Sequence, residues 1–410
     1  MLYLFDRLDS GQLLWSDFWI QHNEHRLVFP KILFLLFGMV SGHNLRVLMF
    51  FSLVLAALQC LMLMHHTARN ARVSGLGRGV FLLWVMYSVF LFSPVQRQNW
   101  LWGFQLQWFL NLLAVGAGGY IFANARPSTA AVAGLTACGA VATFSLSSGM
   151  LYWVVMLFFM LAGRRFDVSK FSIRQIGLLV AAFAGIFVLY MVGYEKPSAH
   201  PGLLVFMDAP ADFFLYVAAY TGGPMAIGRT MGEAVFWGSL GILLSLALMV
   251  MLLRKADAAQ LRFGALFMIL GTYSLLSGVL TAVERAGLGP GQALASRYTS
   301  VSILLWISVL SLLVLSAVGS ETGQGAGKRV KMFLVYAFFG IFTVSSLFSM
   351  GTYAGVYRSR MCGLASVLQP SHPECLVQLY PDPRRLREKD VPTLKRLKLS
   401  VFAEPAPKGK

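Results

Sequence analysis

Residues 299–318 read TSVSILLWISVLSLLVLSAV, twenty residues in succession without a charged side chain. A helix of this length is about 30 Å long, which matches the hydrocarbon core of a bilayer. Apolar runs of similar length recur along the chain and predict ten membrane spans, at approximately residues 45–64, 80–94, 101–123, 129–146, 149–163, 175–192, 233–253, 263–282, 299–318 and 332–350. The shorter run 28–40 contains Pro30 and Lys31, and we expect it to lie at the interface or to re-enter the membrane.

The composition is that of a membrane protein, with 57% hydrophobic and only 12% charged residues. It predicts an all-α polytopic integral membrane protein of about ten transmembrane helices, or eleven in a longer natural form. We expect an exterior interfacial segment at residues 1–44, a transmembrane helical domain at 45–350 and a basic exterior tail at 351–410. Met1 leads directly into this segment without a signal peptide or basic leader, which favours a further span upstream.

The net charge of +17 first suggests a nucleic-acid partner, but the placement of the charge argues against one. About fourteen basic residues collect in alternate loops, against five in the opposite loops, which is the positive-inside pattern. The fourteen are Arg69, Arg72, Arg78, Arg126, Arg164, Arg165, Lys170, Arg174, Arg254, Lys255, Arg262, Lys328, Arg329 and Lys331. This orientation places both chain ends outside the cytoplasm, although the basic tail alone favours the opposite side. We give the short loops precedence because long segments translocate largely regardless of charge.

Four cysteines divide into two kinds. Cys60 and Cys138 lie within predicted spans and are expected to pack as small apolar groups. Cys362 and Cys375 lie in the tail, where an oxidising compartment would allow a disulfide. The alternative is two unrelated thiols.

The sequence His22-Asn23-Glu24-His25-Arg26 is the densest group of ionisable residues, and it precedes the first long apolar run. Ionisable groups beside a bilayer are costly and are usually retained for chemistry or ligand capture. A helix would place His22 and Arg26 on one face, whereas an extended chain would align His22, Glu24 and Arg26. Both conformations remain open, as does a plain solvated loop. A metal site from His22, Glu24 and His25 is a further alternative, although the spacing is not diagnostic.

Further polar groups fall on the same predicted side of the membrane. Gln98, Trp102 and Gln105 are spaced to share one helical face that carries two amides into a span. Buried amides need partners, which neighbouring helices or ligand hydroxyls would provide. The longer connection 193–232 is expected to be either a lid or a solvated loop. The other candidate binding residues are Arg97, Asn99, Arg297 and Tyr298, and an arginine at a span mouth either snorkels or contacts a phosphate.

The overall plan resembles the GT-C-type membrane glycosyltransferases, which take sugars from polyprenyl-phosphate carriers. The resemblance rests on many spans, a first exterior segment with interfacial helices and acidic residues, and an exterior tail. The stretches QHNEHR at 21–26 and NWLWGFQ at 99–105 are also similar to uncharacterised bacterial proteins of this type. Such proteins usually carry their catalytic carboxylate just after a first span, and we predict no such span ahead of the ionisable stretch 22–26 in this sequence. Glu24, Asp17 and Asp6 are therefore all candidates.

The resemblance implies sugar transfer from a polyprenyl-phosphate donor to a glycan or lipid acceptor, on the periplasmic face of a bacterial inner membrane. Glu24 is the expected general base, with Asp17 second, and His22, Asn23 and His25 would orient it or bind sugar. Arg26, Arg97 and Arg297 would stabilise the phosphate leaving group. No cofactor is implied beyond an optional divalent metal, and membrane lipids are the other partners.

Three other classes remain open on the sequence alone. A transporter or flippase for a lipid-linked or small polar solute would use the same polar groups without chemistry. Few acidic residues in the spans and no inverted repeat argue against it. An acyltransferase would place a histidine deep in a span, whereas His22 and His25 precede the spans. A non-catalytic scaffold is the last class.

Overall fold

The computed structural model describes residues 2–42, 44, 46–72, 75–77, 79–166, 170–197, 205–318, 326–368, 373–380 and 382–402. Arg78, part of the 193–232 connection and the last residues of the tail lie outside these ranges. The described part of the chain is helical and contains no β-strand, apart from an isolated bridge between His22 and His25. The prediction of an all-α polytopic membrane fold is confirmed.

Nine helical segments of the described chain are long and apolar enough to cross a bilayer. They are α4 (Val47–Asn70), the segment Gly79–Trp100 that contains α5 (Gly79–Leu91) and α6 (Arg97–Trp100), the segment Gly103–Asn124 that contains α7 (Leu106–Asn124), α9 (Met150–Phe166), α10 (Ile173–Met191), α13 (Met231–Lys255), α14 (Ala258–Arg285), α15 (Thr299–Val318), and α16 (Ala326–Gly351) continued by α17 (Tyr353–Leu368).

The one predicted span that is not among these nine segments, 129–146, forms the shorter helix α8 (Thr129–Thr143). Its 15 residues make it about 22 Å long, and it packs against α7, α9 and α10. The helix is rich in alanine and glycine, so the neighbouring helices approach it closely: a side chain at Gly139 would overlap the ring of Trp153. Nine of the ten predicted spans are therefore present as helices long enough to cross a bilayer, and the remaining one is the shorter apolar helix α8.

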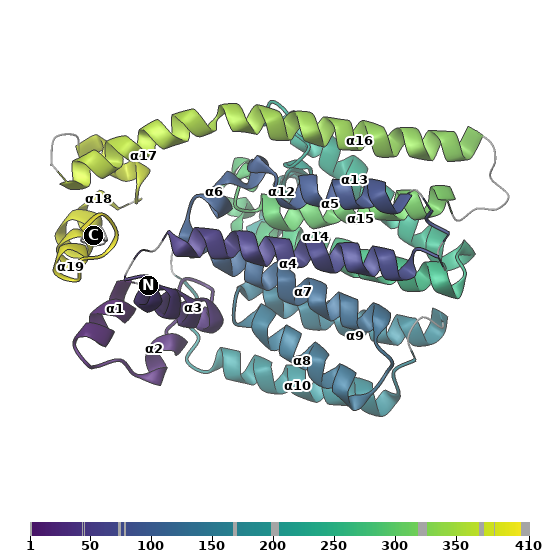
Figure 1. The fold of residues 1–410 in the computed structure, drawn as a ribbon, viewed down its shortest axis with the longest axis horizontal. Coiled ribbons are helices and arrows are strands. Elements are labelled where there is room, and N and C mark those ends of the chain that lie inside the picture. The colour runs from purple at the N-terminus through teal and green to yellow at the C-terminus, as the bar shows by residue number, and fades with distance from the viewer. Residues whose placement is uncertain are drawn as a thin grey trace, which may run out of the picture.

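The first and the last described helices lie at the same end of the helical bundle (Figure 1). We call this the termini end. It carries the turns that follow α5, α8, α10 and α14, and the N-terminal helices α1 (Leu2–Asp9), α2 (Trp15–Trp19) and α3 (Val28–Val40). Helix α16 runs along the edge of the bundle and leads into α17 at this end (Figure 1).

Helix α15 is the centre of the bundle and contacts α5, α13, α14 and α16. Nearly all of its side chains are buried. Its serines pair with backbone carbonyls: Ser308 donates to Phe267 O at 2.5 Å and Ser311 to Ile307 O at 2.7 Å. Helix α15 has no side that faces lipid or water. This explains why apolar side chains cover all of its faces.

The connection 193–232 is not a simple loop, which corrects the sequence prediction. It contains α11 (Val205–Asp208) and α12 (Pro210–Gly222), and the second half of α12 is buried against α13, α14 and α15. Gly222 and Gly238 allow this contact, because a Cβ at either position would overlap a backbone carbonyl of the facing helix. Trp306 Nε1 also donates to Thr221 O at 2.9 Å. With thirteen residues, α12 is too short to be recognised as a span from hydropathy.

Helices α1 and α3 form a separate apolar cluster with the beginning of α4 and with Leu399 of the tail. Leu4 and Phe5 are buried in it, and Gly38 of α3 faces the Phe5 ring. The C-terminal segments are η6 (Pro373–Gln378), α18 (Pro383–Arg385), η7 (Leu386–Asp390) and α19 (Val391–Arg396), and α19 packs on α1. Cys362 of α17 and Cys375 of η6, the predicted pair, form a disulfide.

Candidate functional site

The ionisable stretch 22–26 forms a tight reverse turn, so neither of the two conformations considered from the sequence is present. His22 N donates to His25 O at 2.8 Å, and His25 N donates to His22 O at 3.0 Å. Asn23 takes a positive φ of 51°, a conformation that asparagine tolerates better than most residues. The turn leaves His22 and Asn23 exposed and buries Glu24, which is 5% exposed.

Arg26 anchors this turn to the end of α10. Its guanidinium donates to Tyr190 O at 2.5 Å, to Trp19 O at 2.8 Å and to Val192 O, and it stacks against the Trp19 and Tyr190 rings. Tyr190 in return donates its hydroxyl to Glu24 O at 2.6 Å. The arginine predicted to bind phosphate is therefore committed to backbone carbonyls and holds the turn in place.

A cavity of about 260 Å³ opens between this turn and the bundle at the termini end. Its walls come from the 22–25 turn, the start of α7, the 146–148 turn, the end of α14, Tyr220 of α12 and the 297–298 turn. Eight predicted site residues line it: His22, Asn23, Glu24, His25, Trp102, Gln105, Arg297 and Tyr298. The lining residues that the sequence analysis did not select as a site are Phe104, Gln107, Trp108, Leu146, Ser147, Ser148, Tyr220, Ser277, Leu280, Thr281, Glu284 and Arg285.

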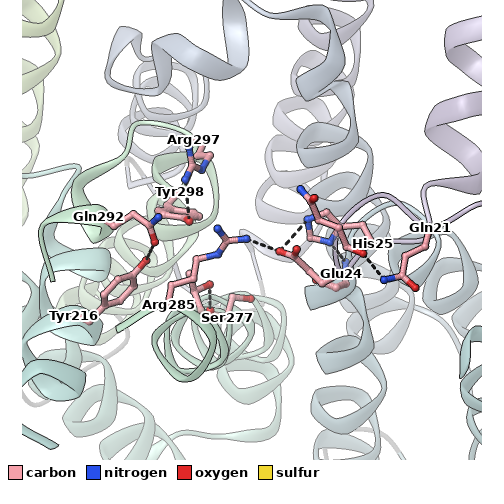
Figure 2. Close-up of polar contacts among 12 residues, drawn as sticks. Gln21, Glu24, His25, Tyr216, Ser277, Arg285, Gln292, Arg297 and Tyr298 are labelled. Atoms are coloured by element: carbon pink, nitrogen blue, oxygen red, sulfur yellow. Dashed lines mark hydrogen bonds and ion pairs between the residues drawn. The ribbon is translucent and has the colours of Figure 1, made fainter. Parts of the chain in front are cut away.

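The Glu24 carboxylate is the most strongly engaged group in the cavity. Arg285 Nη2 donates to Glu24 Oε1 at 2.5 Å, and His25 Nε2 lies 3.4 Å from the same oxygen. Figure 2 shows Arg285 reaching Glu24 from the opposite side of the cavity. Burial on its own raises the pKa of Glu24, but the neighbouring His25 and Arg285, together with hydrogen bonds to the carboxylate, outweigh burial and hold this pKa below its usual value. The carboxylate is therefore ionised at neutral pH.

His25 is oriented from its other ring nitrogen. Ser147 N donates to His25 Nδ1 at 3.2 Å, so the ring proton of the neutral imidazole is on Nε2, the nitrogen that faces Glu24. The 146–148 turn thereby fixes the orientation of the His25 ring. Ser148 Oγ also contacts Tyr273 Oη at 3.2 Å, and Tyr273 donates to Asn111 Oδ1 at 2.7 Å. A chain of polar contacts thus supports the floor of the cavity.

Two glutamine side chains line the cavity without a partner. Gln105 and Gln107 are each 3% exposed, and the Oε1 atom of each is buried without a hydrogen-bond partner in the described chain. Buried amide oxygens without a donor cost roughly 1–3 kcal/mol, so such groups usually meet a ligand or water. Because they lie beside Trp102, which is 50% exposed, the wall combines open acceptors with an aromatic face.

The predicted helical face of Gln98, Trp102 and Gln105 does not exist as one face. The chain is extended at Trp102, and α7 begins only at Leu106. Gln98 and Asn99 instead hold the 296–300 turn: Arg297 N donates to Gln98 Oε1 at 3.2 Å, and Asn99 Nδ2 donates to Arg297 O at 2.8 Å. The Arg297 guanidinium stacks on Tyr298 at 4.9 Å and lines the cavity (Figure 2).

The two other candidate carboxylates lie away from the cavity. Asp17 is 1% exposed, accepts from Leu14 N at 2.8 Å and pairs with Arg7 Nε at 3.2 Å, which caps α2. Asp6 pairs with Arg396 of the tail. Arg97, the third predicted phosphate ligand, lines a different cavity. Of the three candidate bases, only Glu24 is positioned in the cavity.

No group of three His, Cys, Asp or Glu side chains suited to a metal ion occurs among the residues that the structure describes. His22, Glu24 and His25 adjoin one cavity, but they do not form such a group. The ionisable groups of the cavity instead include two acidic side chains, Glu24 and Glu284, and two guanidinium groups, Arg285 and Arg297. This mixture of acidic and basic groups suits a polar ligand that carries both hydroxyl and anionic groups.

Comparison of the chain with known protein families, with curated proteins and with solved structures finds no match.

Proposed function

We propose that this protein is a membrane glycosyltransferase of the GT-C type, which transfers a sugar from a polyprenyl-phosphate donor to a glycan or lipid acceptor. The observation that carries the proposal is the ionised Glu24 carboxylate, held at the wall of a polar cavity by Arg285 and His25. The bundle topology and the positive-inside pattern favour the periplasmic face of a bacterial inner membrane for this cavity.

The cavity offers the groups that a sugar needs. Carbohydrates present hydroxyls around apolar ring faces, and they are bound by amides and by aromatic side chains. Gln105 and Gln107 supply open acceptors, while Trp102 and Tyr298 supply rings in the same wall. A lumen of about 260 Å³ accommodates one sugar residue of the donor.

In the proposed reaction, an acceptor hydroxyl attacks the anomeric carbon of the bound sugar. The new bond joins the acceptor oxygen to the anomeric carbon, and the bond from that carbon to the phosphate oxygen breaks. The electron pair leaves with the phosphate, while the hydroxyl proton passes to Glu24. Arg297 and Arg285 line the cavity, and their positive charges would stabilise the negative charge on the departing polyprenyl phosphate.

The low pKa of Glu24 is compatible with this role. A base must be ionised before the reaction, and the neighbouring cation ensures this at every physiological pH. The acceptor hydroxyl becomes acidic only as its oxygen bonds to carbon, so proton transfer is favourable late in the reaction. His25 orients the carboxylate, because its own position is fixed by Ser147 N.

Transfer of a labelled sugar from a panel of polyprenyl-phosphate donors tests the proposal. Purified wild type is compared with Glu24→Gln, which keeps the shape and removes the base. Glu195→Gln is the matched control, since Glu195 is exposed and lies outside the cavity. We expect transfer by the wild type and the control and none by Glu24→Gln. Absence of transfer with every donor, together with saturable binding of a lipid-linked solute, would instead support a transporter.

A further inference from the structure

A second cavity, of about 370 Å³, lies between the 97–101 turn and α17. It is lined by Arg97, Gln98, Leu101, Gly355, Val356, Ser359 and Arg360, and it shares no lining residue with the Glu24 cavity. Two hydrogen bonds dock α17 on this turn and so form the cavity: Tyr353 donates to Pro94 O at 3.2 Å, and Arg360 Nη1 to Leu101 O at 2.6 Å.

Three guanidinium groups gather here. Arg97 and Arg360 line the cavity, and Arg229 donates to Val95 O at 3.1 Å beside them. Arg97 Nη1 is buried without a hydrogen-bond partner among the described residues. Burial, and secondly the charge of Arg97, lower the pKa of Arg229 to about 10, which still leaves it charged at neutral pH.

None of these three arginines forms an ion pair with a carboxylate in the described part of the chain. Like charges in a half-buried site are unfavourable unless an anion neutralises them. The other polar groups at the cavity, Gln98 and Ser359, are uncharged. The described chain therefore supplies no carboxylate as counter-charge, and the planar guanidinium fork matches the oxygens of a phosphate.

The cavity lies where lipid head groups are expected. The apolar segment Ala326–Leu368 has 43 residues and would be about 65 Å long as a helix, well beyond a bilayer of about 40–45 Å including its head groups. Its last part, α17, is therefore placed at or beyond the head-group level. Leu101 and Val356 add an apolar wall beside the arginines, as a lipid-linked phosphate would require.

We propose that this second cavity binds a phosphate group, with Arg97 and Arg360 as its direct ligands and Arg229 as a supporting charge. The source is either a lipid head group or free phosphate. The inference goes beyond sugar transfer and does not depend on it, because Glu24 and its partners belong to the other cavity.

Binding of labelled phosphatidic acid and of labelled inorganic phosphate to the purified full chain tests this site. Arg97→Gln is the principal variant, because the Arg97 side chain makes no hydrogen bond in the described structure that its loss would break. We expect it to weaken binding about tenfold or more, the loss of one charge-assisted contact. Arg358→Gln, an exposed arginine of the same helix, is the matched control and should change affinity less than about twofold.

Two further variants separate binding from folding and from catalysis. Arg97→Lys keeps the charge and should retain most of the affinity, whereas a misfolded protein would not. Glu24→Gln should bind phosphate as the wild type does, whether or not sugar transfer occurs. Arginine-dependent binding of phosphatidic acid identifies a lipid source, and such binding of inorganic phosphate alone identifies a soluble one. Equal binding of both probes by wild type and Arg97→Gln would overturn the proposal.

Discussion

Replacing Arg26 by glutamine should release the 22–25 turn from the bundle. The guanidinium makes three charge-assisted hydrogen bonds, to Tyr190 O, Trp19 O and Val192 O, and is 3% exposed. Hydrogen bonds from a charged donor contribute roughly 1.5–3 kcal/mol each, or about 5–9 kcal/mol for three. Water will hydrate part of the freed carbonyls at the end of α10, so we expect a net local loss of about 3 kcal/mol.

Amide hydrogen exchange of the turn measures this loss directly. His22 N and His25 N each donate to the other residue's carbonyl, so both amides exchange only when the turn opens. A loss of about 3 kcal/mol raises the open population about 100-fold, and exchange should accelerate by the same factor. Arg46→Gln, an exposed arginine at the start of α4, is the control and should leave these amides unchanged. Unchanged exchange in Arg26→Gln would refute the anchoring role.

Four further outcomes are expected. Arg285→Gln removes a cation that lowers the pKa of Glu24, so the acid limb of the pH–rate profile should move to higher pH than in the wild type. An unmoved limb would exclude Glu24 as its origin. Gln105→Leu removes a buried acceptor without a partner, so we expect a higher unfolding temperature together with a substrate KM raised roughly fivefold or more. A lower unfolding temperature or an unchanged KM would contradict this. Cys362→Ser opens a loop whose closure contributes roughly 3 kcal/mol to stability in the chain-entropy model. Proteolysis of the segment 373–402 should therefore accelerate, and an unchanged rate of cleavage would contradict this expectation. Gly238→Val should lower the unfolding temperature far more than Gly177→Val. The reason is that a Cβ at Gly238 would lie 1.7 Å from Ala218 O, whereas a Cβ at Gly177 would enter open space. Equal effects of the two substitutions would count against the α12–α13 contact.

The membrane fold followed from the sequence because hydropathy is a local property. A span such as 299–318 must form its backbone hydrogen bonds within one helix, and its run of apolar side chains can be recognised directly in the sequence. Helix α12 was missed for the converse reason, since its burial depends on Gly222 and Gly238 of two different helices fitting together. Close packing of this kind has no periodic signal in the chain.

The candidate site was found in part. The density of ionisable groups at residues 22–26 drew attention to Glu24, which lines the cavity, but not to its partner Arg285, which lies 261 residues away. Arg26 has the same chemistry as Arg285 and adjoins Glu24 in sequence, yet it turns to the carbonyls of α10. Proximity to Glu24 in the sequence therefore did not distinguish an arginine that holds the turn in place from one that lines the cavity. The difference between the two arises from tertiary contacts.

Single-turnover transfer from a bound, labelled polyprenyl-phosphate sugar tests the central claim most directly, when wild type and Glu24→Gln are compared at equal donor occupancy. General-base catalysis contributes roughly 10²–10⁴-fold, so the variant should bind donor normally and transfer it at least about 100-fold more slowly. Transfer by Glu24→Gln at the wild-type rate would show that Glu24 is only the ionic partner of Arg285 and that this cavity lacks the proposed base.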